Sequence, residues 1–226
     1  MTDHPILFNS AMVRAILAGR KTQTRRVLNP QPPKGFDFLL NTTFQENDPL
    51  IFWLDDGRSE DLYFNGKAPR IGVGDTLWVR ETWSGQHAYR NIKPSDRIDM
   101  DMGDGRRAVP GNIWYWAEGS PVYGDWERPR PSIHMPRYAS RISLRVTDVR
   151  VELVSDITED DAIAEGIEKS DYPGGWKHYN GVDVGSSWVM NPKVSFQSLW
   201  QTINGPRGLG WAENPWVAAY TFERIE

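Results

Sequence analysis

The sequence predicts an α+β protein built on a small mixed β-barrel, with short flanking helices and long loop insertions. Three observations predict this class. About six short β-prone segments are separated by turn residues, about three short segments have helical periodicity, and long irregular stretches lie between them. Short strands with few long helices favour a barrel over a doubly wound sheet.

The composition narrows the class of protein. A hydrophobic content of 39% can supply a core, but no apolar run approaches the ~20 residues that cross a bilayer. The first residues lack the basic and apolar regions of a secretory signal. The absence of cysteine excludes disulfides, thiolate zinc sites and cysteine nucleophiles, and a net charge of −4 argues against non-specific DNA coating. We therefore expect a cytoplasmic protein with no membrane partner. Most of the 11 tryptophans should be structural, with a few available to stack on bases.

The first elements are a strand and a short amphipathic helix. Residues 5–8 are β-prone, and Ser10 is predicted to cap a helix over 11–18 with one apolar stripe. Gly19 has the position of a glycine that ends a helix in the left-handed conformation. The β-prone residues 22–27 should then form a strand.

The middle of the chain is predicted to alternate insertions with short strands. Proline cannot donate a ladder hydrogen bond, so the proline-rich run at 29–33 ends the preceding strand. In order, we expect an inserted lobe at 28–70 with a hairpin from 51–54 and 62–64, a turn at 72–75, a strand at 76–83, a loop at 84–111, a strand at 112–117 and a loop at 119–136.

The last third should contain a long β-rich run, two helices and a closing strand. The apolar parity of residues 141–153 flips near Thr147 and Asp148, which indicates a bulge or a turn. Thr158 opens a short acidic helix as a variant of the capping box, and Gly166 ends it. We expect an insertion at 168–192, a helix over 194–203 that stops at Gly205, a strand over 216–225, and one domain spanning 1–226 with its insertions at 28–70, 84–138 and 168–192.

Two basic segments are candidates for function. Residues 19–26 contain four basic side chains in an overall acidic protein, which indicates an anionic ligand or a reaction that uses an amine. Residues 128–141 interleave arginine with proline and aromatic residues, a pattern that suits phosphate and base contacts. The alternative for this segment is a proline-stiffened loop whose arginines pair with acids. The four histidines show no metal-ligand spacing, so we expect no metal and no cofactor.

The order of these elements and the basic motif resemble the ASCH family. The signature is Gly19, Lys21, Thr24 and Arg26, and the run 17–24 is very similar to the branch of bacterial 4-acetylcytidine amidohydrolases. The chain also looks like larger ASCH-like proteins of phages and prophages. The resemblance implies a PUA-like barrel that recognises RNA or modified nucleosides. It covers 5–27, 71–83, 139–167 and 194–225, under half the chain, and that branch lacks the insertions.

The resemblance also implies the site residues. Lys21 and Thr24 match two members of the reactive set, and Glu165 is the best match for the third. Amide hydrolysis needs a nucleophile, a proton shuttle and oxyanion stabilisation. In a regular strand Lys21 and Thr24 would face opposite sides, so they converge only if Lys21 still belongs to the turn after Gly19. The cations expected to contact substrate are Arg20, Arg26, Arg80, Arg137 and Arg141.

The predicted function is recognition of a modified nucleoside or RNA with hydrolysis of an N-acyl group. The alternatives are a non-enzymatic module that binds RNA, DNA or a nucleotide, and a metal-independent ribonuclease. Each site residue also has a plain structural interpretation. Lys21 would be a solvated cation at a helix end, Glu165 a surface residue of an acidic helix, and Thr24 an ordinary strand residue. The sequence carries no indication of the oligomeric state.

Overall fold

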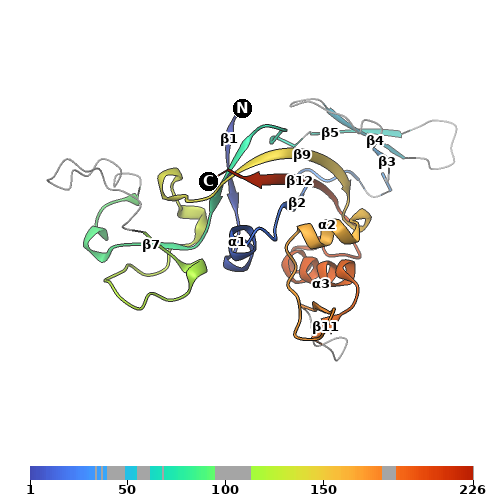
Figure 1. Cartoon of the computed structure of the whole chain (residues 1–226). Helices are drawn as coiled ribbons and strands as arrows, with labels where there is room; N and C mark the ends of the chain where they lie inside the picture. Colours follow the sequence, from blue (N-terminus) through green and yellow to red (C-terminus); the bar gives the residue numbers. More distant parts are fainter. Residues whose placement is uncertain are drawn as a thin grey trace. The chain divides into compact units, whose positions relative to one another are not determined.

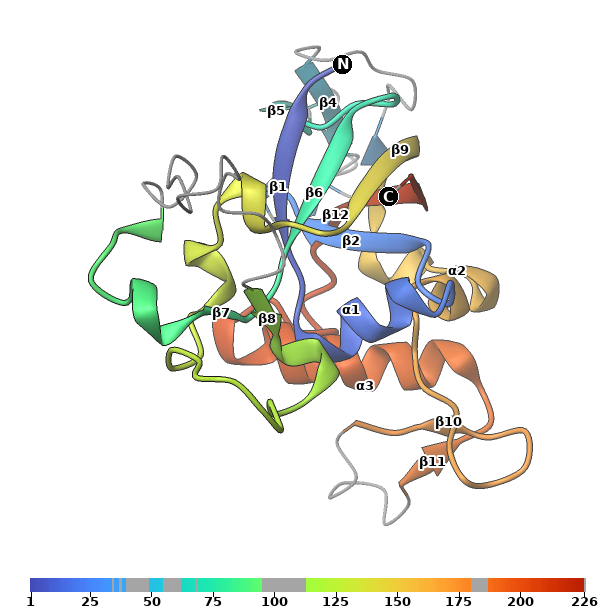
Figure 2. The same cartoon turned by 60° about the vertical axis from the view of Figure 1, so that its left-hand side comes forward.

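The structure is a computed structural model that describes residues 1–33, 35–36, 38–39, 49–54, 62–67, 69–94, 113–179 and 187–225. These residues form short helices and small sheets, which confirms the α+β class (Figures 1 and 2). They cluster into two compact units. The first comprises Met1–Gly19, Asp75–Arg145 and Glu223–Glu226, and the second comprises Arg20–Gly74 and Val146–Phe222.

The first unit contains the predicted N-terminal strand and helix. Strand β1 (Asp3–Leu7) pairs in parallel with β6 (Thr76–Arg80), and β6 pairs antiparallel with the start of β9 (Ser143–Leu153). Helix α1 (Ser10–Leu17) is capped by Asn9 and not by Ser10 as predicted. Asn9 keeps an extended backbone and its side chain accepts a hydrogen bond from the Met12 N–H at 2.9 Å, whereas Ser10 is already helical.

The strand predicted over 76–83 is wrong in its second half, because β6 ends at Arg80. Trp83 begins a different strand, β7 (Trp83–Gly85), which pairs with β8 (Ile113–Tyr115). The indole of Trp83 is buried in a separate apolar cluster with Tyr115, Met135 and Ala139. Burial of this ring in its own cluster accounts for the break, which also places residues 84 and 85 of the predicted loop in a strand.

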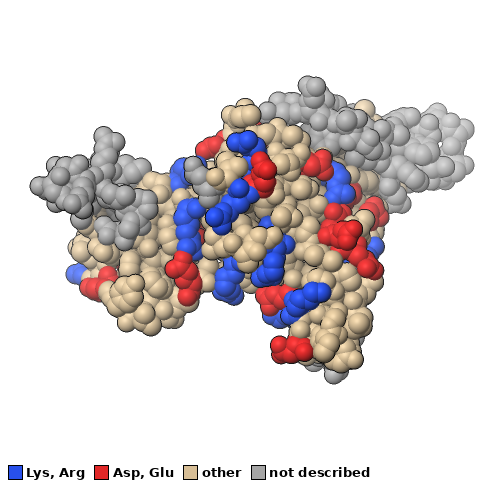
Figure 3. Space-filling model, viewed as in Figure 1, with Lys and Arg blue, Asp and Glu red and all other residues tan. Residues whose placement is uncertain are grey.

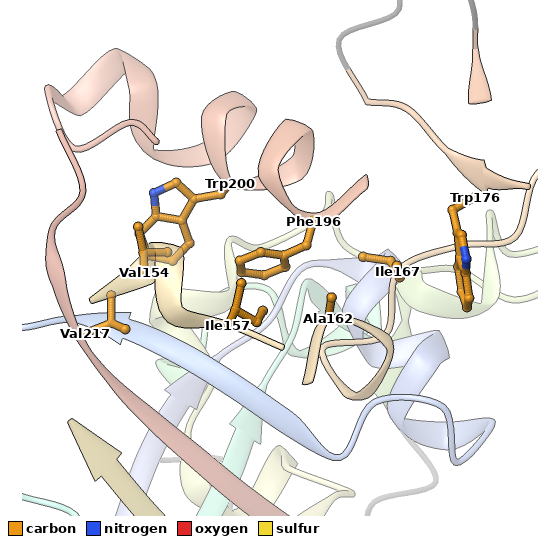
Figure 4. Packing of buried hydrophobic residues seen from close by; sticks show 8 residues of the cluster. All are labelled: Val154, Ile157, Ala162, Ile167, Trp176, Phe196, Trp200 and Val217. Atoms are coloured by element: carbon orange, nitrogen blue, oxygen red, sulfur yellow. The ribbon is translucent and has the colours of Figure 1, made fainter. Parts of the chain in front are cut away.

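The second unit is a layer of strands packed against two helices. Strand β2 (Gln23–Val27) pairs antiparallel with β12 (Trp216–Arg224), and β12 lies beside β9. Helices α2 (Glu159–Ala164) and α3 (Pro192–Asn204) contribute to the core of this unit. Figure 4 shows that core. Its residues come from α3, from the segments around α2 and β12, and from β10 (Trp176–Lys177): Val154, Ile157, Ala162, Ile167, Trp176, Phe196, Trp200 and Val217.

The long strand differs from its sequence-based expectation, and the barrel stays a prediction. Strand β9 runs without interruption through Thr147 and Asp148, so the turn alternative is wrong there. The strand order is β1-β6-β9 in the first unit and β9-β12-β2 in the second, and no pairing among the described residues closes either set into a barrel.

The insertions carry small sheets of their own. Strands β3 (Phe38–Leu39), β4 (Pro49–Leu54) and β5 (Leu62–Lys67) confirm the hairpin predicted within 28–70. In the insertion at 168–192, β10 (Trp176–Lys177) pairs with β11 (Trp188–Val189). Most of the loop predicted over 84–111 lies outside the described residues. Within the parts of the chain that are described, no helix has the length and apolar character to cross a membrane.

Candidate functional site

The backbone after Gly19 delivers Lys21 to the end of helix α2. Gly19 has a φ of 69°, the left-handed conformation that ends α1 and that glycine adopts without steric cost. The Thr22 N–H donates to the Ala164 carbonyl at 2.8 Å, and the Thr22 carbonyl accepts from the Phe222 N–H at 2.8 Å. Residue 22 is therefore held between α2 and β12. Its neighbour Lys21 lies at the C-terminal end of α2, where the helix dipole favours a cation.

The ammonium of Lys21 is buried and fully hydrogen-bonded. Its Nζ donates to the Gln23 carbonyl, to the Glu165 carbonyl and to Glu165 Oε2, each at 2.8 Å. An ammonium has three donors, so these bonds use all of them. The side chain of Lys21 is 0% exposed and that of Glu165 is 6% exposed. The structure therefore brings these two predicted site residues together, and neither is the solvated surface residue of the plain structural interpretation.

A second cation holds the other oxygen of the Glu165 carboxylate. The Arg25 guanidinium donates to Glu165 Oε1 at 3.2 Å, and it also donates to Glu152 at 2.6 and 2.9 Å and to Asp161 at 3.1 Å. Gln23 shares this network, because its Oε1 accepts from Arg25 at 2.6 Å and its Nε2 donates to Asp161. The buried site is thus a network of charges around Glu165.

The sequence-based prediction gave Arg25 no role of its own, because it is one of several neighbouring cations. A signal was present. Asp161 belongs to α2 and Glu165 is the residue that caps its C-terminal end four positions later, so the two side chains lie on the same side of this turn. Gln23 and Arg25 share one face of β2 because side chains alternate along a strand. Two acidic residues at helical spacing match two polar residues at strand spacing.

Burial and neighbouring charge act in opposite directions on Lys21. Burial lowers the pKa of its ammonium below the usual value, the Glu165 carboxylate raises it, and the charges of Arg26 and Arg25 lower it further. The net direction is downward. Because Nζ and Glu165 Oε2 are 2.8 Å apart, a proton can move between them without leaving the network.

Thr24 lies on the other face of β2. Alternation along the strand directs Thr24 and Arg26 away from the face of Gln23 and Arg25, and Thr24 is paired in register with Tyr220 of β12. Among the hydrogen bonds of the described residues, none joins the Thr24 hydroxyl to Lys21 or Glu165. Burial raises the pKa of Tyr220 to about 12, while the charge of Arg26 lowers it.

The remaining predicted substrate cations are divided between the two units. Arg20 is an exposed residue of the second unit, whereas the other three belong to the first. In that unit Arg80 and Arg137 have their guanidinium carbons 5.0 and 5.8 Å from the centroid of the Trp78 ring. Arg141 pairs with Glu81 at 2.9 Å, so at this position the alternative of an arginine paired with an acid is what the structure has. Basic and acidic side chains are interspersed on the face shown in Figure 3.

Neither similarity to known proteins nor a group of metal ligands indicates what this site binds. Comparison with protein-family models, with curated proteins and with solved structures finds no match to the chain. In the described part of the chain, no group of three or more His, Asp or Glu side chains is placed to hold a metal ion. The function proposed below therefore depends on the geometry of the Lys21–Glu165 pair.

Proposed function

We propose that this chain is related to the ASCH family, with a PUA-like fold, and that it recognises a modified nucleoside or RNA and hydrolyses an N-acyl group on it. One observation carries the proposal. Lys21 Nζ lies 2.8 Å from Glu165 Oε2 although 144 residues separate them, and the pair is buried. The resemblance implies a shared role for this lysine and this glutamate, and their contact supports that role.

The proposed chemistry uses Lys21 as a base and Glu165 as its proton relay. Proton transfer to the Glu165 carboxylate gives a neutral amine, which burial favours over the ammonium. The amine takes a proton from a water molecule as the water oxygen adds to the acyl carbon. The proton then passes to the departing exocyclic amine, so water and amide become a carboxylic acid and a free amine. Substrate approach requires Lys21 to release at least one of its three acceptors.

Release of cytidine from 4-acetylcytidine, followed by chromatography, tests the proposal. The wild type should release cytidine, and Lys21→Ala should lose about 100-fold or more of that rate if Lys21 is the base. The control is Lys93→Ala, because Lys93 is an exposed lysine of the first unit and contacts neither Lys21 nor Glu165. This control should retain the wild-type rate.

Two results would contradict hydrolysis by this pair: no release by the wild type, or equal release by the folded Lys21→Ala variant. Circular dichroism of each variant separates loss of chemistry from loss of structure. A Thr24→Val variant measures whether the hydroxyl on the other face of β2 contributes. Loss of turnover in that variant would indicate that Thr24 acts in the reaction together with Lys21 and Glu165.

The non-enzymatic binding module is the second candidate, and one observation favours it. All three donors of the Lys21 ammonium are occupied, so the charge also fits a purely structural role at the end of α2. This candidate predicts binding of a single-stranded RNA oligonucleotide that persists in Lys21→Ala and weakens steeply with salt, with no cytidine released.

A further inference from the structure

A polar groove of about 350 Å³ lies in the second unit. Its lining residues belong to the segments that carry β10 and β11, whose backbone is drawn in Figure 2. Its volume is within the range of roughly 300–1,000 Å³ that is typical of small-molecule sites. The first lining residue of this groove, Glu168, comes three positions after Glu165 in the sequence. Its lining includes four charged side chains and two aromatic rings: Glu168, Lys169, Asp171, Lys177, Tyr172 and Trp188.

A tight turn fixes the backbone of Tyr172 at this groove. The Ser170 N–H donates to the Gly175 carbonyl at 3.1 Å, and the Gly175 N–H donates to the Tyr172 carbonyl at 2.9 Å. A Cβ on Gly175 would lie 2.5 Å from Ser170 Oγ and 3.2 Å from the Tyr172 carbonyl oxygen, so the turn has no room for a side chain there. The ring of Tyr172 is thus presented from an ordered turn.

The rings of Tyr172 and Trp188 form a parallel stack. Their centroids are 3.8 Å apart and their planes differ by 2°. Tyr172 remains 47% exposed, so the stack is not enclosed by the core. A flat ring ligand can extend such a stack, because base–aromatic stacking needs only a planar π-face.

The charges in the groove largely compensate one another. Lys177 Nζ lies 2.8 Å from Glu168 Oε2, and Lys169 Nζ lies 3.3 Å from the centroid of the Trp176 ring. With Asp171, the lining holds two ammonium groups and two carboxylates. A groove built to hold phosphate would carry excess positive charge. This one offers donors and acceptors together, which suits the amino, carbonyl and ring-nitrogen groups at the edge of a nucleobase.

We propose that this groove is a nucleobase-binding site, in which the base stacks on the Tyr172–Trp188 pair and its edge bonds to the charged side chains. The site goes beyond the proposed hydrolysis, because binding of an unmodified nucleoside here requires no reaction at Lys21. The ligand is a nucleoside or an exposed base of a single strand.

Titration of the full chain with cytidine and with adenosine, followed by NMR, tests this assignment. Tyr172→Ala and Trp188→Ala should each weaken binding about fivefold or more, the loss expected for one stacking ring. The control Tyr123→Ala removes a tyrosine that is 74% exposed in the first unit, and it should bind as the wild type does. Binding by Lys21→Ala should also be unchanged, so failure of hydrolysis and failure of this site are separate results.

Three results would overturn the assignment. The first is no binding of either nucleoside. The second is binding that both Tyr172→Ala and Trp188→Ala leave unchanged. The third is binding of maltose without binding of cytidine, which would make the groove a carbohydrate site. If Trp188→Ala fails to fold, Tyr172→Ala decides alone, because its ring is half-exposed and the hydrogen bonds of its turn are made by the backbone and by Ser170.

Discussion

Removing the Glu165 carboxylate should destabilise the protein far more than removing an equivalent carboxylate at the surface. Glu165→Ala takes one acceptor from Lys21 Nζ and one from Arg25, while Lys21 keeps two backbone carbonyls and Arg25 keeps Glu152 and Asp161. Glu168→Ala is the matched control. It breaks a Lys–Glu contact of the same 2.8 Å length, between side chains that are 38% and 45% exposed.

The expected magnitude follows from the two lost contacts. A hydrogen bond to a charged group contributes about 1.5–3 kcal/mol, and breaking a buried ion pair by removing one partner costs about 3–5 kcal/mol. We therefore expect Glu165→Ala to lower the free energy of unfolding by about 4 kcal/mol. The exposed pair should cost about 0–1 kcal/mol, because solvent screens it. With a urea slope of about 2.5 kcal/mol/M, the midpoint of Glu165→Ala should fall by about 1.6 M.

Urea unfolding followed by tryptophan fluorescence measures both variants. The double variant Lys21→Met/Glu165→Leu should recover part of the loss, because it leaves no unpaired buried ammonium. Equal midpoints for Glu165→Ala and Glu168→Ala would refute the reasoning, since they would mean that burial of the Lys21–Glu165 pair has no energetic consequence.

Three further predictions concern the elements that surround the site. Asn9→Ala should lower the free energy of unfolding by about 1 kcal/mol through loss of the cap of α1, whereas Ser10→Ala should lower it by only about 0.2–0.3 kcal/mol. The reverse order would restore Ser10 as the cap. Gly19→Ala should lower the free energy of unfolding by about 1 kcal/mol, and Gly19→Asn should lower it less, because asparagine tolerates the left-handed φ of 69° better than alanine does. A Cβ at this position meets no atom within 4 Å, so the loss reflects backbone strain and not a clash; an equal loss in both variants would argue against this. The folded pKa of Tyr220, about 12, lies above the unfolded value near 10. The stability that it contributes is therefore lost as pH rises from about 10 to 12, by up to about 2–3 kcal/mol, and Tyr220→Phe should unfold with a flatter alkaline limb in the same measurement.

The sequence was sufficient to predict the ends of those elements that are set by interactions between neighbouring residues. The side chain of Thr158 accepts from the Asp161 N–H at 3.1 Å, and Gly166 has a φ of 83°, so the acidic helix begins and ends close to where its capping residues predict. These interactions span a few residues, and their chemistry can be read directly from the sequence.

Features that depend on tertiary packing were not accessible in the same way. The break before Trp83 depends on a ring buried against residues that come later in the chain. Alternation along β2 directs Arg25 to the Glu165 carboxylate, and it places Thr24 beside Tyr220 on the opposite face. The resemblance to the ASCH family placed Lys21 and Glu165 in one predicted site. Only the fold shows how their charges are compensated.

The state of the Lys21 ammonium tests the central claim most directly, and NMR of lysine Nζ groups observes it. Hydrogens of a buried ammonium with three acceptors should exchange slowly with water, so Lys21 should give a protected signal that disappears in Lys21→Met and persists in Lys177→Met. If no protected signal depends on Lys21, then Lys21 is not a buried ammonium held by three acceptors, and this result would contradict the account.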